Sequence, residues 1–123
     1  MRKQTNNDPL RIKSFNLAVR IVNLFKHLSE EKKEFVLSKQ LLRSGTNPGA
    51  MVREAKFAES SKDFIHKLGV AQKETGETMY WLELLKATGY INEGEFKSMY
   101  CDTEEVMKLL TSSIKTKKKN TFL

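Results

Sequence analysis

Apolar residues recur along this chain at steps of three and four, which is the spacing of one face of an α-helix. One such series, of apolar or small residues, is Phe64, Leu68, Ala71, Thr75, Met79, Leu82 and Leu85. A second series is Phe96, Tyr100, Thr103, Met107, Leu110 and Ile114. Each series occupies a narrow arc of a helix that turns by about 100° per residue. A helix cannot bury such a stripe alone, so the pattern predicts several helices packed lengthwise.

Capping residues divide the chain into four predicted helices. The candidate N-caps are Asp8 before Pro9, Ser29, Ser60 or Ser61, and Asn92, and the C-cap signal is Gly89. We predict helices over residues 9–28, 30–58, 61–88 and 92–115, followed by a basic tail over 115–123. Four helices with short connections favour an all-α fold, an antiparallel up-down-up-down four-helix bundle that forms one domain over 1–123.

The second predicted helix has almost no bulk in its middle. Residues 44–50 read SGTNPGA, and small residues let neighbouring backbones approach closely. Pro48 removes one helical hydrogen bond and is expected to kink the helix. A break into two helices at this point is the alternative.

Two helices carry more apolar surface than one buried stripe requires. In the first helix, apolar residues cover more than half of the circumference: Ile12, Phe15, Ala18, Val19, Ile21, Val22, Leu24, Phe25 and Leu28. In the third, Val70, Trp81 and Leu84 lie away from the main stripe. Trp81 either covers the end of the bundle or belongs to a subunit interface, where aromatic residues are enriched. The width of both faces favours an oligomer.

Positive charge is concentrated near the C-terminus. The formal net charge is +7, and four lysines of the tail supply much of it: Lys115, Lys117, Lys118 and Lys119. Four residues of the N-terminal region would join them if both termini lie at one end, as in an up-down bundle: Arg2, Lys3, Arg11 and Lys13. Clustered lysines neutralise phosphates, which predicts salt-sensitive RNA or DNA binding. The alternative is a disordered, solubilising tail.

The remaining composition indicates the compartment. No apolar run approaches the roughly 20 residues of a membrane span, and the N-terminal sequence lacks the apolar segment of a secretory signal. The single cysteine, Cys101, cannot form an internal disulfide. We therefore expect a cytoplasmic protein with no membrane partner.

Catalytic and metal-binding patterns are weak in this sequence. Asp63 and His66 are the nearest match to a Glu-x-x-His motif, but the acid differs and His66 lies opposite the buried stripe. His27 falls on a polar face, and Cys101 lies beside Asp102, whose charge does not favour a thiolate. We expect no catalytic residues, no metal and no cofactor, and therefore no enzyme.

Four segments of the chain carry a resemblance to a known family. They are QLLRS at 40–44, GAMVREA at 49–55, SKDFI at 61–65 and the run 74–90, which ends in TGY. Their order and spacing resemble the four helix bundle protein family associated with intervening sequences of bacterial large-subunit ribosomal RNA. Relatives include the accessory variability determinant of diversity-generating retroelements. The sequence departs from the family where Met51 replaces asparagine, Arg53 replaces a small residue, and Asn47-Pro48 replaces Ser-Ile.

The resemblance implies a four-helix protomer in a homopentameric ring with a basic surface. In retroelement relatives the ring binds a reverse transcriptase and nucleic acid. Arg43, Glu54, Glu77 and Glu83 match polar positions of the family, which form either ion pairs between helices or subunits, or a functional surface. Arg43 and Glu54 join Val70, Trp81 and Leu84 as the expected oligomer interface.

Two main hypotheses about function follow. The first is a non-enzymatic, oligomeric bundle that binds RNA or DNA mainly through phosphates. The second is a protein-interaction module, for example for a reverse transcriptase, without a physiological role in nucleic-acid binding. A third, an enzyme, would require a bound metal or cofactor.

Overall fold

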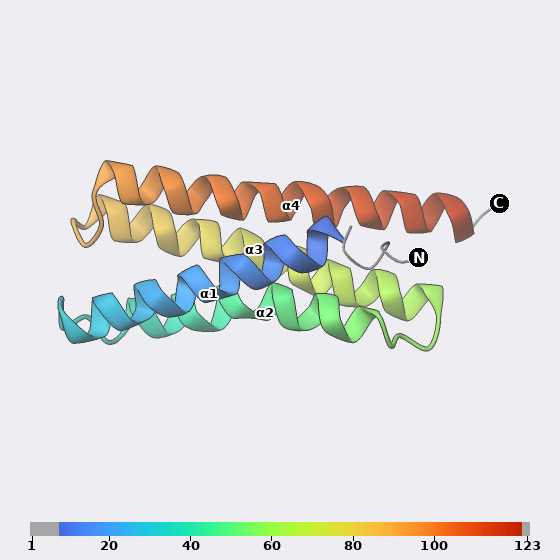
Figure 1. Cartoon of the computed structure of the whole chain (residues 1–123), viewed down its shortest axis with the longest axis horizontal. Coiled ribbons are helices and arrows are strands. Elements are labelled where there is room, and N and C mark those ends of the chain that lie inside the picture. The colour runs from blue at the N-terminus through green and yellow to red at the C-terminus, as the bar shows by residue number, and fades with distance from the viewer. Residues whose placement is uncertain (1–7, 122–123) are drawn as a thin grey trace.

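The computed structural model describes residues 8–121, which form four α-helices and no strand. They are α1 (Pro9–Glu30), α2 (Leu37–Ala55), α3 (Ser61–Ala87) and α4 (Glu93–Thr121). The helices lie lengthwise beside one another, with the connections 31–36 and 88–92 at one end of the molecule (Figure 1). The connection 56–60 lies at the other end, toward which the start of α1 and the end of α4 also point (Figure 1). The predicted all-α class is confirmed.

The helices enclose one hydrophobic core. α1 and α3 each pack against both α2 and α4 but not against each other, and the contact between α1 and α4 is the least extensive. The largest fully buried apolar side chains come from all four helices: Leu17, Ile21, Leu28, Leu41, Leu68, Leu82, Leu85, Val106 and Leu110. Burial of these side chains is the main stabilising contribution, at roughly 1.5–3 kcal/mol for each.

The predicted stripes describe this core well. In α3, Leu68, Ala71, Thr75, Leu82 and Leu85 are buried. The core also contains five apolar residues that were not in the predicted stripes: Leu10 and Leu17 of α1, Ile91 before α4, and Met99 and Val106 of α4.

Three predicted N-caps are confirmed by backbone hydrogen bonds. The amide-to-side-chain pairs are Arg11 N to Asp8 Oδ1 (3.1 Å), Asp63 N to Ser60 Oγ (3.0 Å) and Glu95 N to Asn92 Oδ1 (2.8 Å). After α3, Gly89 has φ +85, a conformation that side chains with a Cβ rarely adopt. The next amide, that of Tyr90, donates to the Leu85 carbonyl (2.9 Å) and completes the predicted glycine C-cap.

The predicted start of the second helix at residue 30, with Ser29 as its N-cap, is wrong. α1 continues to Glu30, and Ser29 Oγ donates to the Phe25 carbonyl (2.8 Å) inside that helix. α2 begins only at Leu37. The capping group is the Glu34 carboxylate, which accepts hydrogen bonds from the amides of residues 36, 37 and 38 at 3.2, 2.9 and 2.7 Å. The connection 31–36 therefore occupies residues that were predicted to be helical.

α2 is continuous through Pro48, so the alternative of two separate helices is not observed, and it ends at Ala55 rather than at 58. The predicted close approach of backbones is confirmed. A Cβ built on Gly45 would lie 2.7–2.9 Å from three side-chain carbons of Ile21. One built on Gly49 would lie 3.3 Å from the Ser14 carbonyl oxygen. Small residues of α2 thus let α1 pack against its backbone.

The predicted end of the fourth helix at residue 115 is also wrong. α4 continues to Thr121, so the lysine-rich segment is helical as far as the structure describes it. Lysine is a good helix former, and cations near a helix C-terminus interact favourably with the helix dipole. The four lysines therefore occupy fixed positions on a helix surface instead of a flexible tail.

Candidate nucleic-acid interface

The four tail lysines project from the last turns of α4. Lys115, Lys118 and Lys119 are exposed and share one side of the helix, because they are three or four residues apart. Lys117 is half-buried, with its Nζ 5.0 Å from the centre of the Phe64 ring in α3. Within residues 8–121, no carboxylate pairs with any of the four. Their positive charge is available to an external anion.

The N-terminal basic residues do not form one cluster with these lysines. Lys13 Nζ lies 3.4 Å from Glu105 Oε1 of α4. Arg11 faces the other neighbour of α1 and lines a groove against α2. Along α4, Glu105 precedes Lys115 by roughly 15 Å of helix axis. The other two predicted contacts, Arg2 and Lys3, lie outside the described residues.

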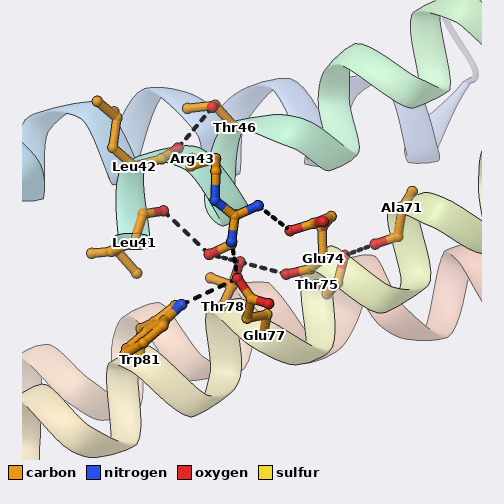
Figure 2. Close-up of polar contacts among 11 residues, drawn as sticks. Leu41, Leu42, Arg43, Thr46, Ala71, Glu74, Thr75, Glu77, Thr78 and Trp81 are labelled. Carbon is orange, nitrogen blue, oxygen red and sulfur yellow. Dashed lines mark hydrogen bonds and ion pairs between the residues drawn. The ribbon is translucent and has the colours of Figure 1, made fainter. Parts of the chain in front are cut away.

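Arg43 of α2 lies between two carboxylates of α3 (Figure 2). One guanidinium nitrogen donates to Glu74 Oε1 at 2.9 Å, and the other donates to Glu77 Oε1. Trp81 Nε1 also donates to Glu77, at 3.4 Å. The hydrogen bond to Glu74 is the main reason why the pKa of Arg43 is raised. Arg43 therefore links two helices of the same chain.

Two other predicted polar positions also have partners inside the chain. Lys67 Nζ lies 2.9 Å from Glu54 Oε1, and this hydrogen bond raises the pKa of Lys67. Tyr100 donates its hydroxyl to Glu83 at 2.8 Å. All four family-matching polar residues, Arg43, Glu54, Glu77 and Glu83, therefore contact a side chain on another helix of the same chain.

Beneath Arg43, buried hydroxyl groups join α2 to α3. Thr78 Oγ1 lies 3.0 Å from Ser44 Oγ, and both side chains are fully buried. Thr78 and Thr75 also donate to the carbonyls of residues four positions earlier, at 2.8 and 2.7 Å (Figure 2). The Oδ1 atom of Asn47 is buried without a hydrogen-bond partner among the described residues. Sequence analysis did not identify this hydroxyl contact, although serine and threonine within apolar stripes were its signal.

The apolar members of the expected oligomer interface lie on the outer side of α3. Val70, Trp81 and Leu84 are half-buried in the single chain. Trp81 packs against the core. Its ring forms a T-shaped pair with that of Tyr80, which is 55% exposed, at 5.0 Å between centres. This outer side thus retains apolar area that the chain itself does not cover.

A groove between α1 and α2 was not predicted. It has a volume of about 210 Å³ and is lined by Arg11, Phe15, Ala18, Gly49, Ala50 and Arg53; we call it the α1–α2 groove. Phe15 is 53% exposed, and the guanidinium carbon of Arg53 lies 5.7 Å from the centre of its ring. The wide apolar face of the first helix was the available signal, but the sequence did not indicate which part of that face stays uncovered.

Residues that sequence analysis considered for chemistry are dispersed. Across residues 8–121, no three His, Cys, Asp or Glu side chains lie close enough to hold a metal ion. Cys101 is exposed. Of the four helices described, none combines the length and apolar character that a membrane crossing requires.

Comparison with known proteins gives a family match and matches among solved structures. The model of the family described as 23S rRNA-intervening sequence protein matches residues 10–112. A crystal structure from Bacteroides thetaiotaomicron, described as a protein of unknown function from the S23 ribosomal protein family, is 56% identical. It superposes with a TM-score of 0.85 and covers 86% of this chain and 95% of its own. No curated protein matches. The family match includes Arg11, Lys13 and the α1–α2 groove but ends before Lys115.

Proposed function

The chain belongs to the 23S rRNA-intervening sequence protein family, and on this premise we propose that it is a non-enzymatic, oligomeric helical bundle that binds RNA or DNA through phosphates. Its copies, each an antiparallel up-down-up-down bundle, assemble as a homopentameric ring. The compartment is a reducing cytoplasm, because the single cysteine, Cys101, has no partner for a disulfide.

One observation carries this proposal: Lys115, Lys117, Lys118 and Lys119 occupy the final turns of α4 without a carboxylate partner in the described chain. A lysine that contacts a phosphate releases a condensed counterion, which favours binding at low salt. A helix presents its lysines in a fixed array, so less conformational entropy is lost on binding than from a flexible tail.

Assembly multiplies this effect. With a formal charge of +7 for each chain, five copies would carry about +35. The surface proposed for assembly runs along the outer side of α3 and its junction with α2, and contains Val70, Trp81, Leu84, Arg43 and Glu54. Because Arg43 and Glu54 already have partners within the chain, the three apolar residues contribute most of the association energy.

The second candidate function is a protein-interaction module, for example an accessory protein for a reverse transcriptase. Exposed apolar side chains favour it. Phe57 is 87% exposed and Val36 is 71% exposed, in the connections at opposite ends of the bundle. Such a module would retain one defined protein through nuclease treatment and high salt.

The deciding experiment measures RNA and DNA binding by nuclease-stripped protein across a salt series, with the mass of the assembly determined on the same sample. We expect affinity to fall steeply with salt. Replacing the four tail lysines by glutamine should weaken binding to all sequences and reduce the salt slope by about one for each lost phosphate contact.

A matched control removes the same charge elsewhere. Lys26, Lys32, Lys39 and Lys97 are exposed and have no carboxylate partner in the described chain. Replacing these four by glutamine lowers net charge equally and should change the slope much less. Equal effects of the two variants would mean that only net charge matters. No binding at low salt from a well-formed oligomer would favour the protein-interaction module.

A further inference from the structure

We propose that the α1–α2 groove is a binding site for single-stranded nucleic acid, in which one base stacks on Phe15 while Arg11 and Arg53 contact the neighbouring phosphates. This inference rests on the proposed function only in taking nucleic acid as the partner. It assigns a surface distinct from the lysines of α4 and adds a preference for single strands.

The first argument is the exposure of the aromatic ring. Phe15 lies in the second turn of α1, and about half of its side chain, 53%, remains in contact with water. A planar apolar ring held on a helix is a platform for stacking, and every base presents a face that can stack on it. In a duplex the bases are already stacked and paired, so only a single strand can offer one.

The second argument is that Arg11 and Arg53 are not paired with carboxylates in the described chain. Of the four arginines described, Arg20 pairs with Asp102 and Arg43 pairs with two glutamates. Arg11 and Arg53 line the α1–α2 groove and have no carboxylate partner within residues 8–121. A guanidinium group binds phosphate through paired N–H donors. That of Arg53 also makes a cation–π contact with Phe15, with its central carbon 5.7 Å from the ring centre.

The third argument is the shape of the groove. Gly49 and Ala50 form its α2 side, and α1 approaches so closely that a Cβ on Gly49 would lie 3.3 Å from the Ser14 carbonyl oxygen. The volume of about 210 Å³ is below the roughly 300–1,000 Å³ of pockets that enclose a small molecule. A groove of this size accommodates one unit of a longer chain.

Its position agrees with this role. The start of α1 and the C-terminal end of α2 lie on the same side of the middle of the molecule as the end of α4 (Figure 1). The tail lysines therefore raise the local concentration of a polyanion near the groove. In this arrangement the lysines attract single-stranded and double-stranded nucleic acid alike. The groove then binds single strands in preference to duplexes.

The test compares binding of a fluorescent oligothymidylate with binding of a duplex of the same length to the full chain at one salt concentration. Phe15→Ala should weaken single-strand binding roughly tenfold and leave duplex binding within about twofold. Phe15→Trp should restore the single-strand affinity. Arg53→Gln should also weaken it. Val19→Ala is the control, since Val19 is 44% exposed and lies one turn further along α1.

A second readout locates the base. Ultraviolet cross-linking of an oligonucleotide that contains 5-bromodeoxyuridine should label the peptide containing Phe15. Unchanged single-strand affinity in Phe15→Ala, or equal loss for both probes, would overturn the groove while leaving the lysine surface of α4 intact. Loss of assembly in Phe15→Ala would assign the groove to subunit contact and overturn it as well. If the unmodified protein binds neither probe, both the inference and the proposed function are wrong.

Discussion

At the scale of single residues, Glu34 determines where α2 begins. Burial alone would raise the pKa of its carboxyl group, but the hydrogen bonds donated by the amides of Leu37, Ser38 and Val36 together outweigh this effect and lower the pKa below the ordinary value of 4.5. The carboxylate replaces three hydrogen bonds that the first turn of a helix cannot make internally. The charged form is therefore the one that stabilises the fold.

Replacing Glu34 should show how much its carboxylate contributes to the stability of the fold. Because the pKa is lower in the folded than in the unfolded chain, the stabilisation is complete above about pH 4.5 and is lost as pH falls through the folded-state value. Glu34→Gln should lower the free energy of unfolding at pH 7 by roughly 1–3 kcal/mol. It should also flatten the loss of stability on acidification, as measured by urea unfolding at several pH values.

The control for this variant is Glu31→Gln, three residues earlier in the same connection. Glu31 is exposed and its side chain makes no hydrogen bond within the described chain. It should change stability little at any pH. A Glu34→Gln protein that is as stable as Glu31→Gln at pH 7 would show that the amides are satisfied by water.

Gly45 tests the close contact between α1 and α2. A methyl group there would overlap three carbons of the buried Ile21 side chain, at 2.7–2.9 Å. Overpacking of this kind costs roughly 1–3 kcal/mol, which exceeds the gain of about 1 kcal/mol from replacing glycine by alanine in a helix. Thermal unfolding of Gly45→Ala should therefore show a lower midpoint.

Gly69 of α3 is the matched control, because a Cβ there meets nothing within 4 Å. Gly69→Ala should stabilise the protein by roughly 0.5–1 kcal/mol from helix propensity alone. If both variants are stabilised, Ile21 can move aside and the contact is not tight.

Local sequence predicted the caps at Asp8, Ser60 and Asn92 because each depends on residues within one turn. The same rule failed at Ser29, where a serine followed by two glutamates fits a helix start but lies in the last turn of α1. The residue that caps α2, Glu34, is not among the usual N-cap types, so sequence rules had no reason to select it.

At the scale of whole helices, periodicity predicted α3 and most of α4. Thr75 and Thr103 were correctly included in the buried stripes, because each hydroxyl donates to a carbonyl of its own helix and the rest of the side chain is apolar. What periodicity lacks is the register between two helices. Arg43 meets Glu74 and Glu77 only because α2 and α3 are aligned at that level, and neither pattern alone determines the alignment.

The extension of α4 beyond residue 115 also depends on a neighbouring helix. Lys117 Nζ lies 5.0 Å from the centre of the Phe64 ring, which joins the last turns of α4 to the start of α3. An exposed cation–π contact contributes roughly 0.5–1 kcal/mol. Lys117→Gln should therefore speed hydrogen exchange of the amides from residue 117 onward by about two- to fivefold.

Lys118→Gln is the control for this measurement. It removes the same charge from an exposed side chain of the same turn, and therefore has the same effect on the helix dipole without removing the contact with Phe64. Equal acceleration in the two variants would mean that charge at the C-terminus, rather than the ring, keeps these turns helical.

At the scale of the whole molecule, the sequence indicated too much apolar surface without locating it. The wide face of α1 was recognised, but the α1–α2 groove requires Phe15 and Arg53 to meet from different helices. Their contact depends on the close approach at Gly49. Likewise, the lysines from residue 115 onward were recognised as a basic cluster. Lys13 does not belong to it, because Lys13 pairs with Glu105, ten residues earlier on α4.

Two apolar surfaces could form the subunit interface, the outer side of α3 and the outer side of α1, and substitutions can distinguish them. α1 and α3 do not contact each other, so their outer sides belong to separate parts of the surface. If the outer side of α3 forms the subunit interface, Leu84→Glu should dissociate the oligomer to protomers, as measured by mass at several concentrations. A carboxylate there would be buried without a partner, which is strongly unfavourable. Val19→Glu on α1 should leave the assembly intact.

The fluorescence of Trp81 should report dissociation of the oligomer in the unmodified protein. Trp81 is the single tryptophan of the chain, half-buried beside Leu84 on α3, so its emission should shift to longer wavelength when dilution separates the subunits. Val70→Lys, a second variant of this side, should reproduce the dissociation, while circular dichroism shows whether each variant keeps its helices.

Dissociation by Val19→Glu but not by Leu84→Glu would place the interface on α1. Subunit contact would then explain the exposed Phe15, and the groove would no longer be free to bind a single strand.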